Sequence, residues 1–172
     1  MNRTQKKGFS LVEIITILFI VSLGLVGILS LIVQNIQSQS YNRDNLIAYQ
    51  LAQEGIELIR KVRDSNWKAG LPFNTNLAPD TDIVYQYYMD YRDSAPHDAS
   101  GNPDTLSILK KDVYGYYFHD LASPATSSGF SRLITVEQGL DDSFLRIFSQ
   151  VSWGDRTRGY YYDLETVLYD WR

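Results

Sequence analysis

The clearest feature of the sequence is a long hydrophobic run near its beginning. From Phe9 to Val33 the chain has no Lys, Arg, Asp, Asn, Gln or His, and Glu13 is the only charged side chain. A helix needs roughly 20 mostly apolar residues to cross the hydrocarbon core of a bilayer, so the run predicts a membrane-spanning helix. A carboxylate inside such a helix is costly, by ~2.5–3.5 kcal/mol for Asp at the helix centre. Glu13 is therefore a candidate functional residue.

After Gln34 the composition becomes polar, and a helical pattern then resumes. Apolar or small residues recur with the i, i+3, i+4, i+7 spacing of an amphipathic helix at Leu46, Ile47, Leu51, Ala52, Gly55, Leu58, Ile59 and Val62. Glu57 and Lys61 stand four apart, which favours a surface ion pair. Asn66 and the following Gly70 and Pro72 predict the helix end.

One continuous helix over 9–66 would measure ~85 Å at 1.5 Å per residue. A single compact domain does not need that length, whereas a helix that packs against copies of itself does. Gly24 and Gly27 lie inside the apolar run. They either let helices approach closely, as small residues do in membranes, or mark a place where the helix loosens, or simply reflect how common glycine is in membrane helices.

The remainder of the chain predicts an antiparallel sheet, because strand-like segments alternate with turns. We expect loops over 68–81 and 93–104, a small polar connector over 122–129, and strands over 83–91, 106–118 (bent at 110–112), 130–138, 144–153 and 160–171. In the last strand Leu164, Thr166 and Leu168 alternate with Glu165 and Val167. An apolar sheet face must be covered, and the stripe of the amphipathic helix suits it. The fold class is therefore α+β: a long N-terminal helix, its membrane half protruding, packed against a C-terminal antiparallel sheet.

Charge gives the expected orientation. Arg3, Lys6 and Lys7 precede the apolar run, and the next basic residue is Arg43. The bias of positive charge toward the cytoplasm places the N-terminus inside and the rest of the chain outside. The 172 residues include 16 Lys and Arg, 20 Asp and Glu, and no cysteine. Disulfides, zinc-thiolate sites and cysteine nucleophiles are thus excluded, and the acidic balance argues against direct binding of nucleic acid.

The segment Lys6-Lys7-Gly8-Phe9-Ser10-Leu11-Val12-Glu13 resembles the N-terminus of type IV prepilins and the related pseudopilins. The segments 53–57 and 63–67 and the last strands look similar to minor pilins. The resemblance implies that Lys6, Lys7, Gly8 and Phe9 form the processing site of a prepilin peptidase and N-methyltransferase. The peptidase would cut between Gly8 and Phe9, the new amine on Phe9 would be methylated, and Glu13 would guide assembly.

The same resemblance implies a domain organisation and a set of partners. Residues 1–8 would be the leader, 9–33 the membrane and assembly half of the helix, 34–67 its outer half, and 68–172 a β-rich extracytoplasmic domain. The partners would be other pilin subunits, contacted through the helix, and the inner-membrane assembly platform. The chain would span the cytoplasmic membrane once before assembly into a cell-surface pilus or an extracytoplasmic pseudopilus.

Physical chemistry adds a role for the cleavage. A positive amine on Phe9 would lie four residues from Glu13, on the same helix or on a neighbouring subunit, and pairing offsets part of the cost of burying two charges. Three alternatives stay open: an uncleaved signal anchor, an anchored binding module or adhesin that does not polymerise, and a pseudopilin of type II secretion or competence.

Other chemistry has little support. His97 and His119 are the only histidines, and no Gly-x-Ser-x-Gly or phosphate-binding loop is present, so we expect neither an enzyme nor a cofactor. A weak calcium candidate is the loop with Asp93, Asp98, Asn102 and Asp104, because calcium prefers several oxygen ligands. Three clusters of tyrosines either form strands or supply exposed rings for binding.

Overall fold

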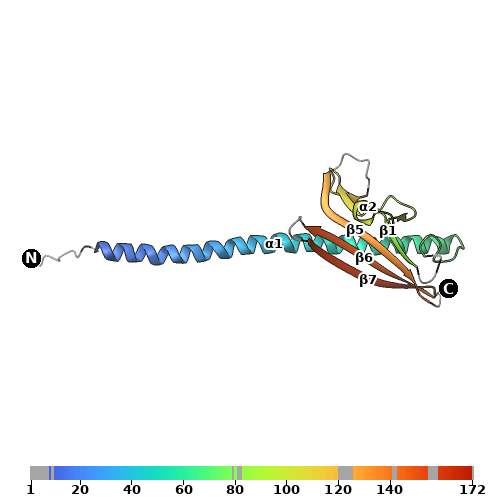
Figure 1. Ribbon diagram of the computed structural model, residues 1–172, viewed down its shortest axis with the longest axis horizontal. Coiled ribbons are helices and arrows are strands. Elements are labelled where there is room, and N and C mark those ends of the chain that lie inside the picture. The colour runs from blue at the N-terminus through green and yellow to red at the C-terminus, as the bar shows by residue number, and fades with distance from the viewer. Residues whose placement is uncertain are drawn as a thin grey trace, which may run out of the picture. The chain divides into compact units, whose positions relative to one another are not determined.

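The computed structural model describes residues 8, 10–78, 80, 83–119, 126–140, 143–154 and 159–171. The chain divides into two compact units, Met1–Arg43 and Asp44–Arg172. The elements run in the order α1 (Leu11–Lys68), β1 (Val84–Tyr88), β2 (His97–Asp98), α2 (Pro103–Leu106), β3 (Ile108–Lys111), β4 (Tyr117–Phe118), β5 (Thr126–Gln138), β6 (Phe144–Gly154) and β7 (Gly159–Tyr169). The expected α+β class, with a long N-terminal helix followed by an antiparallel sheet, is confirmed (Figure 1).

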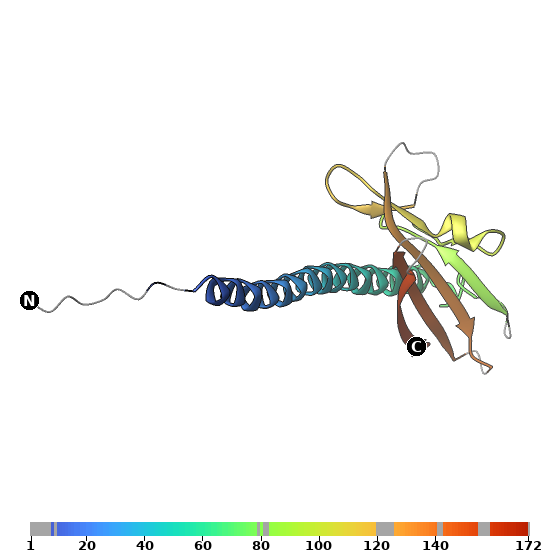
Figure 2. The same cartoon turned by 60° about the vertical axis from the view of Figure 1, so that its left-hand side comes forward.

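Over the described residues the sheet has seven strands and is built around β5. One side of β5 pairs with β6, which pairs in turn with β7. The other side pairs with β1 near the C-terminal end of β5 and with β3 near its N-terminal end, and β2 and β4 extend these two short arms. Figure 2 shows β5 between these two groups of strands. All of the pairings are antiparallel.

The core of the second unit lies between α1 and the sheet. The inward residues of β6 alternate strictly with outward ones, as a strand with one buried face requires. The α1 residues Ile56, Ile59 and Val62 pack in one cluster with inward residues of the sheet, among them Ile134 and Leu168. A second cluster joins Ala48, Leu51 and Ala52 of α1 to Leu109, Phe130, Val151 and Trp153. The stripe predicted from helical spacing is thus buried from Leu51 to Val62, whereas its first member, Leu46, is exposed.

The helix ends two residues later than predicted, at Lys68. Gly70 has a φ of +72°, its N–H donates to Trp67 O at 3.1 Å, and the N–H of Leu71 donates to Asn66 O at 2.9 Å. This pair of bonds is a Schellman motif, in which a glycine in the left-handed conformation satisfies the last carbonyls of a helix. Asn66 does not stop the helix. Its side-chain amide donates to Phe73 O and Thr75 O and so fixes the turn that follows.

Three other expectations were wrong in detail. Residues 126–129, predicted as connector, begin β5, because Thr126 and Ser127 pair with Lys111 and Lys110 of β3. The segment 106–118 is not one bent strand but two short ones, β3 and β4, joined by a turn in which the carboxylate of Asp112 accepts from backbone N–H groups. The loop predicted over 93–104 contains β2 and the start of α2.

A predicted surface pair is also absent. Glu57 pairs with Arg60, three residues along α1, and the ammonium group of Lys61 instead donates to the backbone oxygen of Asp93 at 3.0 Å. Lys61 therefore ties α1 to the loop that follows β1.

Candidate functional site

The residues predicted to direct processing and assembly lie at and before the start of α1. Gly8 is exposed and lies outside any helix, with open space where a Cβ would be. Glu13 is exposed in the first turn of α1. Lys6, Lys7 and Phe9 lie outside the described residues.

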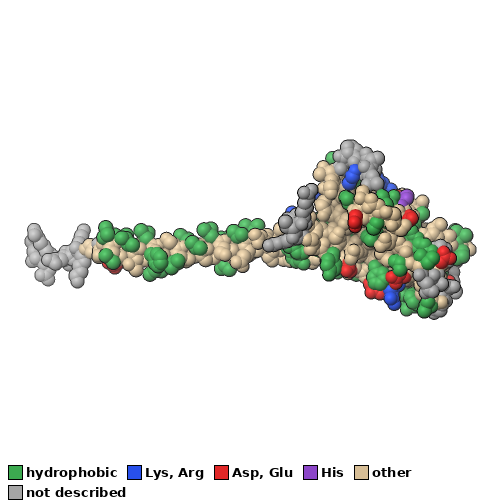
Figure 3. Space-filling view, in the orientation of Figure 1, with side chains coloured by type: hydrophobic (Ala, Val, Ile, Leu, Met, Phe, Trp, Pro, Cys, Tyr) green, Lys and Arg blue, Asp and Glu red, His purple; other side chains and the backbone are tan. Residues whose placement is uncertain are grey.

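The part of α1 within the first unit is exposed throughout and is mostly apolar as far as Val33. All residues over 10–43 are exposed, and large hydrophobic side chains cover this segment (Figure 3). Two hydroxyls of the apolar segment donate within the helix: Thr16 Oγ1 donates to Val12 O at 2.8 Å and Ser22 Oγ donates to Leu18 O at 2.7 Å. In lipid every polar group needs an internal partner. By length and composition this helix could cross a membrane.

Glu13 shares one side of the helix with two glycines. At 3.6 residues per turn, Gly24 and Gly27 lie within about 40° of Glu13 around the helix axis. A Cβ added at either glycine would meet no atom within 4 Å, so neither is required by contacts within the chain. This side of α1 carries one carboxylate and, further along, a narrow backbone ridge of the kind that lets two helices approach closely.

The predicted calcium loop uses its carboxylates locally. Its four candidate ligands are Asp93, Asp98, Asn102 and Asp104. Asp98 Oδ1 accepts from the backbone N–H and the hydroxyl of Ser100, which lowers the pKa of this carboxyl. Asp93 Oδ2 accepts from the backbone N–H of Asp90 at 2.8 Å. In the described part of the chain, no three side chains of His, Cys, Asp or Glu gather where they could hold a metal ion.

A buried guanidinium was not anticipated. Arg132 on β5 is fully buried. It donates to Leu51 O at 3.0 Å and to Met89 O at 2.6 Å, and its Nη1 lies 3.1 Å from a carboxylate oxygen of Glu54. Arg132 thereby joins α1, β5 and the segment after β1. The available signal was the inward position of an arginine in an alternating strand, between Phe130 and Ile134.

A second buried charge lies in the same region. Asp90 is 1% exposed, and its carboxylate accepts from Arg92 and from the backbone N–H of His119. Burial alone would raise the pKa of Asp90, but the hydrogen bonds and charge of Arg92 lower it. Burial, with a contribution from the charge of Arg132, lowers the pKa of His119 to about 4. Among the described residues neither ring nitrogen of His119 has a hydrogen-bond partner, so His119 is held neutral.

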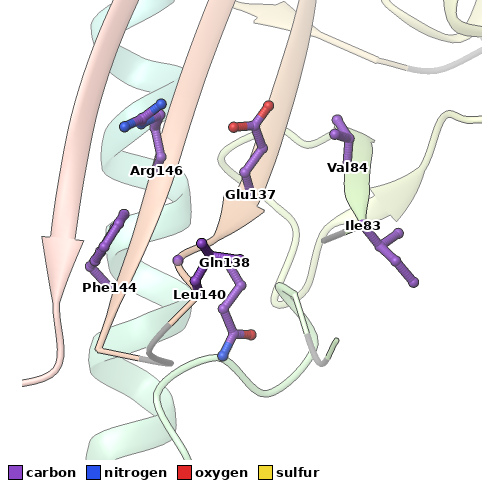
Figure 4. A pocket seen from close by; sticks show the side chains of 8 residues that line it. Ile83, Val84, Glu137, Gln138, Leu140, Phe144 and Arg146 are labelled. Atoms are coloured by element: carbon purple, nitrogen blue, oxygen red, sulfur yellow. The ribbon is translucent and has the colours of Figure 1, made fainter. Parts of the chain in front are cut away.

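In the described part of the chain, two surface depressions of ligand size stand out. One, of about 430 Å³, lies where β1 begins and β5 turns into β6 (Figure 4). Glu137 and Arg146 are directly opposite on paired strands, and Ile83, Val84 and Leu140 supply apolar lining. Among the residues that the structure describes, its lining includes no serine, cysteine or histidine, so these residues offer no pair of nucleophile and base.

The other depression, of about 620 Å³, lies between α1 and the turn before β4. The rings of Tyr91 and Tyr116 line it with their centroids 5.9 Å apart, and Gln50 and Glu54 face it from the helix. The tyrosine clusters thus divide: Tyr87 is buried with its hydroxyl on Leu77 O, whereas Tyr116 is 60% exposed. Some of the tyrosines are therefore core residues, whereas others present exposed rings.

Comparisons with known proteins add no relative: no protein-family model, curated protein or solved structure matches the chain significantly. The architecture itself is pilin-like, with a long N-terminal apolar helix packed on an antiparallel sheet. The candidate functional site is the start of α1. There the carboxylate of Glu13 lies in the first turn of a helix that is long and apolar enough to span a membrane.

Proposed function

We propose that the chain is a structural subunit, a minor pilin or minor pseudopilin, of a type IV pilus-like filament. A prepilin peptidase cuts it between Gly8 and Phe9 and methylates Phe9. Before assembly the subunit is anchored in the cytoplasmic membrane with its C-terminal domain outside. The assembly platform then incorporates it into a filament, in which α1 contacts other subunits. It acts through contacts with other subunits and not as an enzyme.

One observation carries the proposal. The helix over 10–43 is exposed along its whole length, it is apolar over 14–33, and its first turn holds a lone carboxylate. Lipid covers such a surface before assembly, and the same helix from neighbouring subunits covers it afterwards. The amine of Phe9 on one subunit and Glu13 on another then pair and set the axial register of the two helices.

Processing is tested by intact mass and N-terminal sequencing of the protein from its native membrane. We expect a chain that begins at N-methylated Phe9. Gly8→Val should leave the leader attached, because bulk is added at the cut. The fold should be unchanged, since a Cβ added at Gly8 would meet no described atom within 4 Å. A wild-type chain that keeps residues 1–8 in cells with an active prepilin peptidase would refute the pathway and favour an anchored module.

Assembly is tested by Glu13→Leu, with Thr16→Leu as the matched control one turn further along the same helix. Both changes replace an exposed polar side chain by leucine in the apolar segment. We expect Glu13→Leu to be processed and folded but to be depleted from sheared filaments at least about tenfold, whereas Thr16→Leu is incorporated normally. Equal incorporation of the two variants would refute the role of the carboxylate.

A further inference from the structure

β7 is a long strand with one side open. It pairs along its whole length with β6 and, among the strands that the structure describes, with no other. At eleven residues it is much longer than the other terminal strands of the sheet, β2 and β4, which have two residues each. In Figure 1 it borders the sheet. A long open edge is a template for pairing with another chain.

The hydrogen bonds beside the ladder show which backbone groups face outward. The N–H of Gly139 donates to Phe144 O, and the N–H of Asp170 donates to Ser143 O, both between residues directly opposite in register. Residues opposite each other alternate between bonded and non-bonded pairs in an antiparallel ladder. Even-numbered residues of β7 therefore bond to β6. The N–H and C=O groups of the odd-numbered residues, from Tyr161 to Tyr169, point away from it.

The two sides of this edge differ in chemistry. Toward α1, a groove of about 280 Å³ is lined by Gln53, Ile56, Glu57 and Arg60 of the helix and by Leu164, Glu165 and Thr166 of β7. Glu57 and Arg60 pair with each other, and Ile56 and Leu164 supply apolar surface. This side therefore suits a small side chain without charge.

On the opposite face, Asp163 and Glu165 are exposed next to the open edge. Asp163 accepts from the neutral amide of Gln150 at 2.9 Å, and Glu165 lies 3.5 Å from Arg146 in a half-exposed pair. The local charge stays negative, because two carboxylates face one guanidinium. This side suits a basic side chain.

A second copy of β7 does not fit this edge. Two antiparallel β7 strands would bring the carboxylates at 163 and 165 against those of the other copy, and like charges opposite each other destabilise a pair of strands. A strand added to β7 would place successive side chains alternately over the groove and beside the carboxylates. The matching segment thus alternates small apolar and basic residues.

We propose that the open edge of β7 binds, by strand addition, an extended segment of a different polypeptide in which basic and small apolar residues alternate. Main-chain hydrogen bonds to the odd-numbered residues of β7 supply affinity for any extended strand. The groove and the carboxylates supply the preference for alternating small apolar and basic side chains. The proposal does not depend on the assembly role of α1, since it rests on residues 53–60 and 143–170 alone.

The test uses the full chain in micelles of a non-ionic detergent and a fluorescent, end-blocked heptapeptide of alternating lysine and valine. A peptide with four lysines followed by three valines is the composition control. We expect saturable binding of the alternating peptide by fluorescence anisotropy, at least about tenfold tighter than binding of the control. Hydrogen exchange should slow over 159–169 and not over β4.

Glu165→Pro is the decisive variant. It removes an outward N–H and leaves the bonds to β6 intact, and proline is tolerated at such positions of edge strands. Glu165→Thr is the matched control that removes the same charge but keeps the N–H. We expect binding to fall about tenfold or more with Glu165→Pro and less with Glu165→Thr.

A charge reversal keeps the test independent of the fold of the proline variant. The double variant Asp163→Lys, Glu165→Lys should lose the lysine–valine peptide and bind a glutamate–valine peptide instead. Equal binding of the alternating and block peptides, or unchanged binding by Glu165→Pro, would overturn the proposal. So would a wild-type chain that dimerises through β7, because a second copy would then be the occupant.

Discussion

α1 approaches the sheet closely at Gly55, and replacing this glycine with alanine tests the packing directly. A Cβ at this position would lie 2.4 Å from Ser149 Oγ, 3.3 Å from Ser149 Cβ and 3.2 Å from Arg132 Cδ. Both neighbours are fully buried, so neither can turn into solvent. Glycine at this point in the helix is thus a requirement of packing.

Two effects oppose each other in Gly55→Ala. Alanine stabilises a helix interior by ~1 kcal/mol relative to glycine. Overpacking a buried site costs ~1–3 kcal/mol, and the cost should be near the upper end because two buried side chains must move. We therefore expect the free energy of unfolding to fall by ~1–2 kcal/mol, with the opposite sign from that of helix propensity alone.

Ser149→Ala makes the prediction sharper. The hydroxyl of Ser149 is buried and, in the described structure, has no hydrogen-bond partner, and such a group costs ~1–3 kcal/mol. Ser149→Ala should therefore be neutral or stabilising. In the Ser149→Ala background the 2.4 Å contact is gone, so Gly55→Ala should become nearly neutral. The coupling free energy between the two sites is then at least ~1 kcal/mol.

The assay is denaturant unfolding of the full chain in micelles, followed by tryptophan fluorescence, because Trp67 and Trp153 are both buried in the second unit. Gly101→Ala is the control, since a Cβ there meets nothing within 4 Å, and its unfolding midpoint should stay near that of the wild type. A Gly55→Ala protein that is more stable than the wild type in both backgrounds would refute the close approach.

Three further predictions concern buried polar groups. Arg132→Met should lower the free energy of unfolding by ~3 kcal/mol, because removing this guanidinium leaves its buried partners unsatisfied. Arg146 is exposed, so Arg146→Met should lower it by less than ~1 kcal/mol. Equal losses for the two variants in denaturant unfolding would contradict the prediction. Burial holds the pKa of His119 at about 4, below its unfolded value of about 6.5. The contribution of neutral His119 to the free energy of unfolding is therefore complete above pH 6.5 and is lost as the pH falls through 4. Between pH 7 and pH 3 the free energy of unfolding should therefore fall by ~3 kcal/mol more in the wild type than in His119→Phe. Parallel curves of this free energy against pH for the two proteins would exclude the effect. Burial raises the pKa of Tyr87 to about 12 and its hydroxyl donates to Leu77 O, so Tyr87→Phe should cost ~1 kcal/mol in the same assay; an unchanged midpoint would show that this bond contributes nothing.

Local pattern was enough to predict most of the fold. The buried stripe of α1, with Ile59 and Val62 at its centre, follows from helical spacing. The strands β6 and β7 follow from alternation and from the turns beside them. In these elements the side that each residue presents depends on its own period, so nearby sequence suffices.

The misses share a physical cause, which is pairing between distant segments. Thr126 and Ser127 are small and polar, as in a connector, but the partner strand β3 supplies their hydrogen bonds. Lys61 could have paired with Glu57, but the backbone oxygen of Asp93 lies within its reach. The burial of Arg132 was not predicted because its partners at 51, 54 and 89 are far away in the sequence.

The N-terminal residues show the opposite case. The carboxylate of Glu13 and the glycine at position 8 were evident from the sequence, because their significance depends on a linear motif and not on a folded pocket. The structure adds that Glu13 is exposed on the same helix side as Gly24 and Gly27.

The order of the elements along the chain has a consequence for biosynthesis. One core cluster joins Ile56 on α1 to Leu168 near the end of β7. A ribosome therefore makes the helix long before the strands that cover it, and the face with Ile56 and Ile59 stays bare until almost the whole second unit has been synthesised. Contacts of such long sequence separation form slowly. The nascent chain thus exposes an apolar helical face through most of its synthesis, and this face makes it prone to aggregation until the final strand has been made.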